Sequence, residues 1–155
     1  MSRRSRPPRQ RARPKSAPRP RPDYKARGEA VELCFAHRSA RLGLIVSKPH
    51  GDSAPYDFIV EGSDILRRVQ VRSIGSRSFY GSYQVSVAYG GRDRSAFMPG
   101  QVEVVAVYII PEDTWYLIPV DALQGRRSVH LGGGRRLLEC FRERWTILGA
   151  PQRNL

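Results

Sequence analysis

Residues 57–72 of this chain, DFIVEGSDILRRVQVR, decide its fold. Two apolar runs surround a Gly-Ser-Asp turn at 62–64, which predicts a β-hairpin. Such a hairpin places Asp57 beside Gln70 and Arg72, and the two-residue period of a strand puts the last two on one face. We therefore expect a carboxylate, an amide and a cation to converge at one edge of a sheet.

The rest of the chain supplies further strands between two helices. Asp23 is suited to cap a helix over 24–42, and the apolar spacing at 137–148 predicts a closing helix. A short helical turn is expected from Asp121. The predicted strands are 44–46, 56–61, 66–73, 83–89, 102–110, 115–119 and 129–131. A helix, a run of mostly antiparallel strands and a closing helix predict an α/β or α+β sandwich.

Charge divides the 155-residue chain into two parts. Residues 1–22 contain nine of its 27 Lys and Arg residues, six Pro and none of its 14 acidic residues. A segment of this composition cannot bury enough apolar surface to offset its ordering entropy, so we expect a disordered tail over 1–22. A single domain is expected over 23–150. The basic tail suits a polyanion such as nucleic acid, and the alternative is a solubilising extension.

Several other classes of protein are disfavoured. The chain has no run of about 18 apolar residues that would span a membrane, and no apolar segment follows Arg3-Arg4 as an export signal requires. Its two cysteines, Cys34 and Cys140, have no Cys or His neighbours at zinc spacing. We expect both to be buried free thiols in a cytoplasmic protein without a membrane partner.

The polar residues of the hairpin fit the hydrolysis of a phosphodiester. That reaction is assisted by a divalent cation, which polarises the phosphate and acidifies water. Mg²⁺ prefers oxygen ligands and commonly takes one or two carboxylates. Asp57 offers one carboxylate and Glu32, on the first helix, a second. The Gln70 amide and the Val71 carbonyl offer further oxygens, and Arg72 offers a positive charge beside them.

Each of these residues also has a purely structural interpretation. Glu32 fits a solvated helix surface, with Glu29 one turn earlier as the alternative ligand. Asp57 is also typical of an acidic residue in a turn. Gln70 and Arg72 are also typical of the exposed face of an edge strand. His50 lies in a loop rich in Gly and Pro, where an exposed histidine is expected.

Four segments resemble the PD-(D/E)xK nuclease superfamily, and most of all its homing endonucleases associated with group I introns. They are RGEAVE at 27–32, KP with GD at 48–52, YD at 56–57 and RVQVRS at 68–73. The resemblance continues through 104–108, 115–121, Glu143 and Trp145, and so covers nearly all of 25–148. It implies a restriction-endonuclease-like core, in which helices flank a mixed central sheet. It also implies a divalent cation as cofactor, DNA as substrate, and a dimer or tetramer.

Position by position, the resemblance implies that Glu32, Asp57 and Gln70 form a metal site. Arg72 stands where the family has its catalytic lysine. Arginine keeps the charge but does not readily release a proton. Two functions therefore stay open: a Mg²⁺-dependent endonuclease of double-stranded DNA, or a catalytically impaired nucleic-acid-binding protein on the same fold. A third is an RNA-associated protein that binds through its basic tail.

Basic residues in predicted loops are candidates for contact with the DNA backbone. Such contacts would make binding depend on salt without reading sequence. The candidates are Lys48, Arg77, Arg92, Arg94, Arg126 and Arg127. Tyr80 and Tyr83 lie near one of these loops, and we expect core or edge positions for them.

Overall fold

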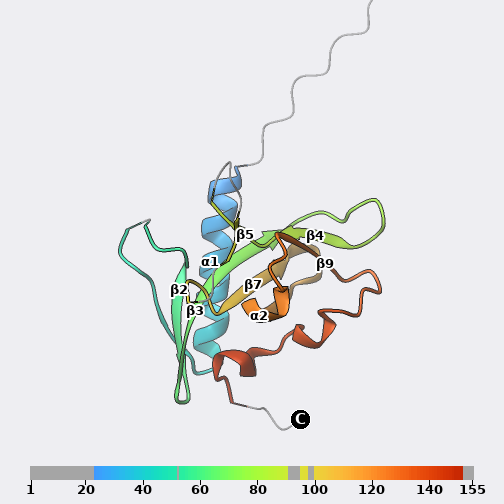
Figure 1. Cartoon of the computed structure of the whole chain (residues 1–155). Helices are drawn as coiled ribbons and strands as arrows, with labels where there is room; N and C mark the ends of the chain where they lie inside the picture. The colour runs from blue at the N-terminus through green and yellow to red at the C-terminus, as the bar shows by residue number, and fades with distance from the viewer. Residues whose placement is uncertain (1–22, 52, 91–94, 98–99, 152–155) are drawn as a thin grey trace, which may run out of the picture.

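The computed structural model describes residues 23–51, 53–90, 95–97 and 100–151, and the predicted tail lies outside these ranges. Its centre is a sheet in the order β1-β2-β3-β7-β8 (Figure 1). Only β3 and β7 run parallel, so the sheet is mixed, as predicted. The strands are β1 (Ile45–Ser47), β2 (Phe58–Gly62), β3 (Ile65–Ile74), β7 (Val104–Ile109) and β8 (Thr114–Pro119).

Helix α1 (Tyr24–Arg41) covers one face of this sheet. Asp23 caps it as predicted, because its carboxylate accepts hydrogen bonds from the N–H groups of residues 25 and 26 at 3.1 and 3.0 Å. Phe35 is fully buried and packs against three aromatic rings. Its ring centroid lies 5.5 Å from those of Phe58 and Trp115 and 5.8 Å from that of Trp145. These rings fix α1 over the strands that carry the site.

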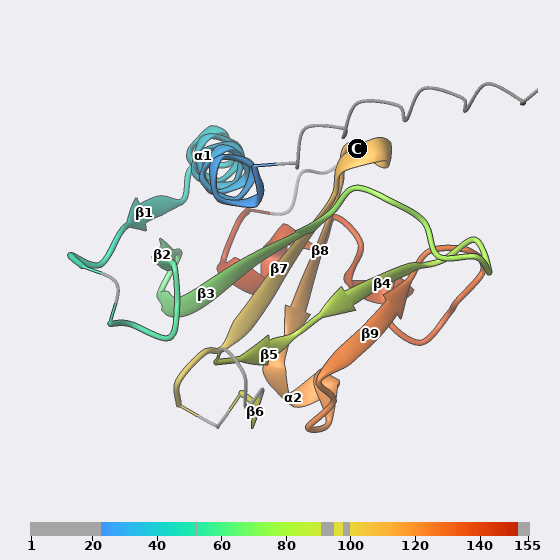
Figure 2. The same ribbon diagram turned by 90° about the horizontal axis from the view of Figure 1, so that it is seen from above.

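A two-stranded ribbon lies on the other face of the sheet. It pairs β4 (Tyr83–Ser86) with β9 (Ser128–Leu131), which follows α2 (Val120–Leu123). Figure 2 shows α1 on one side of the sheet and this ribbon on the other. The predicted strand at 83–89 is interrupted at Val87, because the Val87 N–H donates to the Arg127 carbonyl. The chain then continues as β5 (Ala88–Tyr89), which pairs with β6 (Ser95–Ala96).

The predicted closing helix at 137–148 is wrong. The segment forms two short 3₁₀ turns, η2 (Glu139–Phe141) and η3 (Trp145–Leu148), and a further turn, η1 (Ile110–Glu112), joins β7 to β8. Between η2 and η3 the backbone leaves the helical region, with Glu143 at φ 49°. There the Glu143 carboxylate accepts hydrogen bonds from the backbone N–H of Trp115 and from the indole N–H of Trp145. These tertiary contacts override the helical spacing.

The expectation of buried thiols is also wrong. Cys34 and Cys140 are both exposed. The buried side of α1 consists of Val31, Phe35 and Ser39, spaced four residues apart, and Cys34 lies beside that stripe rather than on it. No helix within the described ranges is long and apolar enough to cross a membrane.

Candidate metal and active site

The site forms where β2 ends beside a longer β3. The first residue pair of this ladder is Phe58 with Val69, so Asp57 lies just before β2 and opposite Gln70. The Asp57 N–H still donates to the Val69 carbonyl at 2.9 Å. Beyond this point β3 continues to residue 74 without a β2 partner. The backbone of Val71 therefore meets a side chain instead of a strand.

The Asp57 carboxylate takes the place of the missing strand. Its Oδ2 accepts hydrogen bonds from the Val71 N–H at 2.7 Å and from Nε2 of Gln70. Burial raises the pKa of Asp57, and the charge of Glu32 adds to this, whereas the Val71 N–H, Arg72 and Gln70 oppose it without cancelling it. A carboxylate with a raised pKa lacks full compensation for its charge, and a bound cation would supply it.

Helix α1 completes the site from the other side. Its residues Gly28, Val31 and Glu32 line an open cleft of about 240 Å³, which residue 57 and residues 70–73 of β3 close. The structure thus brings Glu32, Asp57, Gln70 and Arg72 together, as the sequence predicts. Glu29, the alternative ligand, is exposed and does not line this cleft.

Glu32 has a partner that the sequence did not reveal. Nζ of Lys48 lies 2.7 Å from its Oε2, and the same ammonium lies 5.8 Å from the centre of the Phe58 ring. This contact with Glu32 raises the pKa of Lys48. Lys48 was expected on a DNA-binding surface, and the structure places it at the rim of the site, held by one carboxylate.

Backbone carbonyl groups hold the guanidinium of Arg72 in place. Its guanidinium donates to the Val71 carbonyl at 3.1 Å and to the Ala88 carbonyl at 3.3 Å, which joins β3 to β5. The Val71 carbonyl, predicted as a metal ligand, therefore already accepts one hydrogen bond. A carbonyl oxygen has two lone pairs, so this bond leaves it capable of a second interaction.

The donor set fits a hard divalent cation. Asp57 and Glu32 provide carboxylates, Gln70 an amide that is 7% exposed, and Val71 a carbonyl. In the described part of the chain, no three His, Cys, Asp or Glu side chains gather in a group that could hold a metal ion. A site with two carboxylates and neutral oxygens matches Mg²⁺, which usually takes few carboxylates and keeps several waters.

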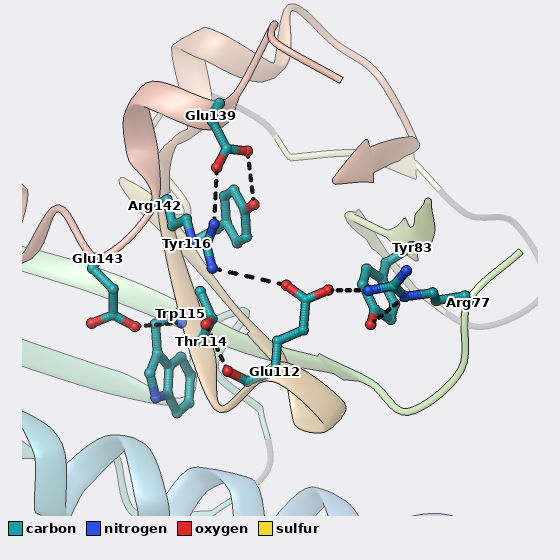
Figure 3. Close-up of polar contacts among 9 residues, drawn as sticks. All are labelled: Arg77, Tyr83, Glu112, Thr114, Trp115, Tyr116, Glu139, Arg142 and Glu143. Carbon is teal, nitrogen blue, oxygen red and sulfur yellow. Dashed lines mark hydrogen bonds and ion pairs between the residues drawn. The ribbon is translucent and has the colours of Figure 1, made fainter. Parts of the chain in front are cut away.

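The remaining predicted residues lie elsewhere. Arg126 and Arg127 are exposed between α2 and β9, and His50 is exposed as expected. Arg92 and Arg94 lie outside the described residues. Arg77 donates to the Tyr83 hydroxyl at 2.9 Å and to Glu112 at 2.8 Å (Figure 3). Tyr83 is buried in the core as expected, whereas Tyr80 is 81% exposed.

The contacts of Figure 3 form a structural network. Glu112 pairs with Arg142 as well as with Arg77, and Glu139 pairs with Arg142 and accepts from the Tyr116 hydroxyl at 2.9 Å. Burial and the Glu139 hydrogen bond raise the pKa of Tyr116. Glu139 ties η2 to β8, and Glu112 ties η1 to Arg77 and Arg142, so both charges are used in holding the fold together.

A mixed sheet whose strand edge offers a carboxylate and an amide, facing a second carboxylate on a helix, is the arrangement of a class of nuclease domains. The chain belongs to the PD-(D/E)XK endonuclease family, whose model matches residues 23–135. The predicted restriction-endonuclease-like fold is thereby confirmed.

Two solved structures are similar to this one. The bacterial homing endonuclease I-Ssp6803I shares 24% sequence identity, with a TM-score of 0.73 over 82% of this chain and 93% of the other. Hjc, a Holliday junction resolvase from Archaeoglobus fulgidus, shares 11% identity, with a TM-score of 0.55 over 82% of this chain and 99% of the other. None of the curated proteins compared with the chain matches it.

Proposed function

We propose that this protein is a Mg²⁺-dependent endonuclease that hydrolyses phosphodiester bonds of double-stranded DNA. The observation that carries the proposal is the Asp57 carboxylate, held by Val71 and Gln70 at the open edge of β3 and facing Glu32 across the cleft. Membership of a family of endonucleases supports it. The net charge of +13 suits a polyanionic substrate.

Each residue of the cleft has a part in this proposal. Glu32, Asp57, Gln70 and the Val71 carbonyl would hold the metal ion. When bound, Mg²⁺ would polarise the scissile phosphate and lower the pKa of a water molecule. The Asp57 contacts to Gln70 and Val71 keep its carboxylate in place before the ion arrives. Arg72 contributes positive charge beside the phosphate.

Lys48 has a separate part. Its ammonium pairs with Glu32 and offsets the negative charge that Glu32 places near Asp57. A metal ion bound to Glu32 would weaken this ion pair. The freed ammonium, with three rotatable donors on a flexible chain, suits a phosphate oxygen.

Exposed basic residues would contact the DNA backbone. Arg126 and Arg127 are exposed, and Arg77 has 58% of its side chain exposed despite its bond to Glu112. Cutting both strands of a duplex needs two active sites, so we infer a homodimer or a tetramer. We also propose that the protein is cytoplasmic.

The test is nicking of supercoiled plasmid by the full chain with Mg²⁺. We expect D57A and E32Q to abolish nicking and EDTA to stop it. E29Q is the matched control: Glu29 lies on the same helix one turn earlier but outside the cleft, and this variant should cut like the wild type. Nicking that survives D57A would overturn the proposal.

The second candidate is a nucleic-acid-binding protein whose catalysis is impaired. The two hydrogen bonds that tie Arg72 to backbone carbonyls favour it, because they restrain the guanidinium against the fold. A wild-type chain that binds duplex DNA without cutting it, together with an R72K variant that cuts, would select this candidate.

A further inference from the structure

Two aromatic side chains are left in solvent at the turn between β3 and β4. Phe79 is 98% exposed and Tyr80 is 81% exposed, and their rings meet edge to face at 5.5 Å. Both views place this turn at the end of the molecule away from β1 and β2 (Figures 1 and 2). Two large neighbouring rings in water are unfavourable, and such exposed groups commonly mark an interaction site.

The turn that carries these rings is held firmly. The Ser78 N–H donates to the Ser82 carbonyl at 2.7 Å, and the Ser82 hydroxyl lies 3.1 Å from Nδ1 of His130 on β9. A neighbouring glycine turn packs directly against it, since a Cβ on Gly133 would lie 2.9 Å from the Gly81 carbonyl oxygen. The rings therefore project from two interlocked turns, so a partner meets them with little ordering cost.

The two interlocked turns carry positive charge in their sequences. Arg135 and Arg136 follow the glycine turn and are exposed, and neither has an ion pair among the residues that the structure describes. Residues 75–83 and 131–137 contain no Asp or Glu. We call Phe79, Tyr80, Arg135 and Arg136 the aromatic tip. It combines apolar rings with cations that have no ion pair. A nucleic acid offers bases for the rings and phosphates for the cations, so it fits this tip better than an apolar protein surface does.

We propose that the aromatic tip binds duplex DNA held by the same molecule, with its rings packed against bases in a groove and inserted at a base step. Arg135 and Arg136 would contact the flanking phosphates. The proposal rests on duplex DNA as the substrate of the proposed function. Proteins that place apolar side chains between base steps unstack them locally and bend the duplex, which increases the area of contact.

A second copy of the chain is the less suitable occupant. In a symmetric contact the same patch lies on both partners, so a tip-to-tip dimer would bring Arg135 and Arg136 near their own copies. Like charges at close range oppose such a contact, whereas a phosphate backbone neutralises them.

The test measures binding of the full chain to a 30-base-pair duplex by fluorescence anisotropy in EDTA, so that no cleavage occurs. We expect F79A/Y80A to weaken binding by about tenfold or more, because stacking of a base on an aromatic ring contributes at least that order. The matched control F79Y/Y80F keeps two rings and should bind like the wild type. R135Q/R136Q should reduce the slope of log K against log salt by up to about 1.8, whereas F79A/Y80A should leave it unchanged.

A 2-aminopurine placed along the duplex reports unstacking. Its fluorescence should rise at one or more positions with the wild type and not with F79A/Y80A. Both side chains are almost fully exposed, so alanine removes no core contacts and the melting temperature should not change. Equal affinity of F79A/Y80A and wild type, or no fluorescence rise at any position, would overturn the proposal.

Two further outcomes separate this proposal from others. If F79A/Y80A keeps its DNA affinity but elutes as a smaller oligomer, the tip is a contact between copies and the proposal fails. If D57A loses nicking but keeps affinity that depends on the tip, both proposals gain support. No duplex binding by the wild type at low salt would overturn both, whereas binding without nicking would overturn only the proposed catalysis.

Discussion

Replacing Arg72 with lysine should make the protein less stable and a better nuclease. The guanidinium makes two hydrogen bonds to backbone carbonyls, at 3.1 Å to Val71 and 3.3 Å to Ala88. A lysine has one compact ammonium, which cannot span both carbonyls in the same way. At a net value of about 1 kcal/mol per hydrogen bond, R72K should lose about 1–2 kcal/mol of folding free energy. For a domain of this size that lowers the melting temperature by about 3–8 °C.

The same substitution should help the site. It removes the Nη1 bond from the Val71 carbonyl, which the metal ion would use, and it supplies a cation that is free to follow the phosphate. We therefore expect R72K to bind Ca²⁺ or Mn²⁺ more tightly in calorimetry. Plasmid nicking should be at least about tenfold faster, a change of about 1.4 kcal/mol in barrier.

R126K serves as the stability control for this substitution, because Arg126 is exposed on the turn after α2, outside the cleft and the core. Its melting temperature should equal that of the wild type. If R72K melts like the wild type, the two carbonyl contacts do not hold the protein together as described. If R72K folds stably but nicks plasmid more slowly than the wild type, Arg72 itself contacts the substrate phosphate, and the expectation that lysine improves the site is wrong.

Three further perturbations follow from other parts of the structure. Burial raises the pKa of Glu103, but the hydrogen bonds and charge of Arg68 outweigh it, so that pKa lies below its usual value. E103Q should therefore cost about 1 kcal/mol at pH 7 in urea unfolding. The difference should begin to shrink as pH falls below about 4.3, the usual glutamate pKa in the unfolded chain, and should vanish only below the lowered pKa of the folded state. G149A should lower the melting temperature by several degrees, because Gly149 has φ 82° and its new Cβ would meet the backbone carbonyl at the end of β2; unchanged melting would contradict this. K48M should leave Glu32 without its partner and slow nicking by about tenfold or more, with a melting temperature close to that of the wild type, since the exposed ion pair contributes little to stability. If K48M nicks plasmid at the wild-type rate, Lys48 has no role in the active site.

The arrangement of Asp57 beside Gln70 was predictable because it depends on local geometry. A short Gly-containing turn fixes the register of a hairpin, and a register error of one residue would turn the apolar positions outward. The observed ladder pairs Phe58 with Val69, which sets Asp57 opposite Gln70 as predicted. Placing Glu32 in the same cleft required the resemblance to a known family, because helix-to-sheet packing is not encoded in a short segment.

The features that sequence did not predict all depend on contacts between distant segments. Lys48 meets Glu32 only because it directly follows β1, which packs beside α1. The apolar spacing at 137–148 suits a helix, but Glu143 leaves the helical region to bind Trp115 across 28 residues. The exposure of Tyr80 also depends on how its turn packs against Gly133. Periodicity describes one element at a time and carries no information on such contacts.

The two cations of the site differ in how firmly they are held, and this difference determines which one can act. Arg72 lies between two carbonyls of the fold, and moving it toward a substrate would break bonds that join β3 to β5. Lys48 is held by one ion pair at the rim, and its partner Glu32 would be taken over by the metal. We therefore propose that Lys48 is the mobile charge at the phosphate in the wild type, and that R72K would add a second one. In a double-mutant cycle, K48M should then cost much less in the R72K background than alone, and equal costs in both backgrounds would show that the two positions serve different steps.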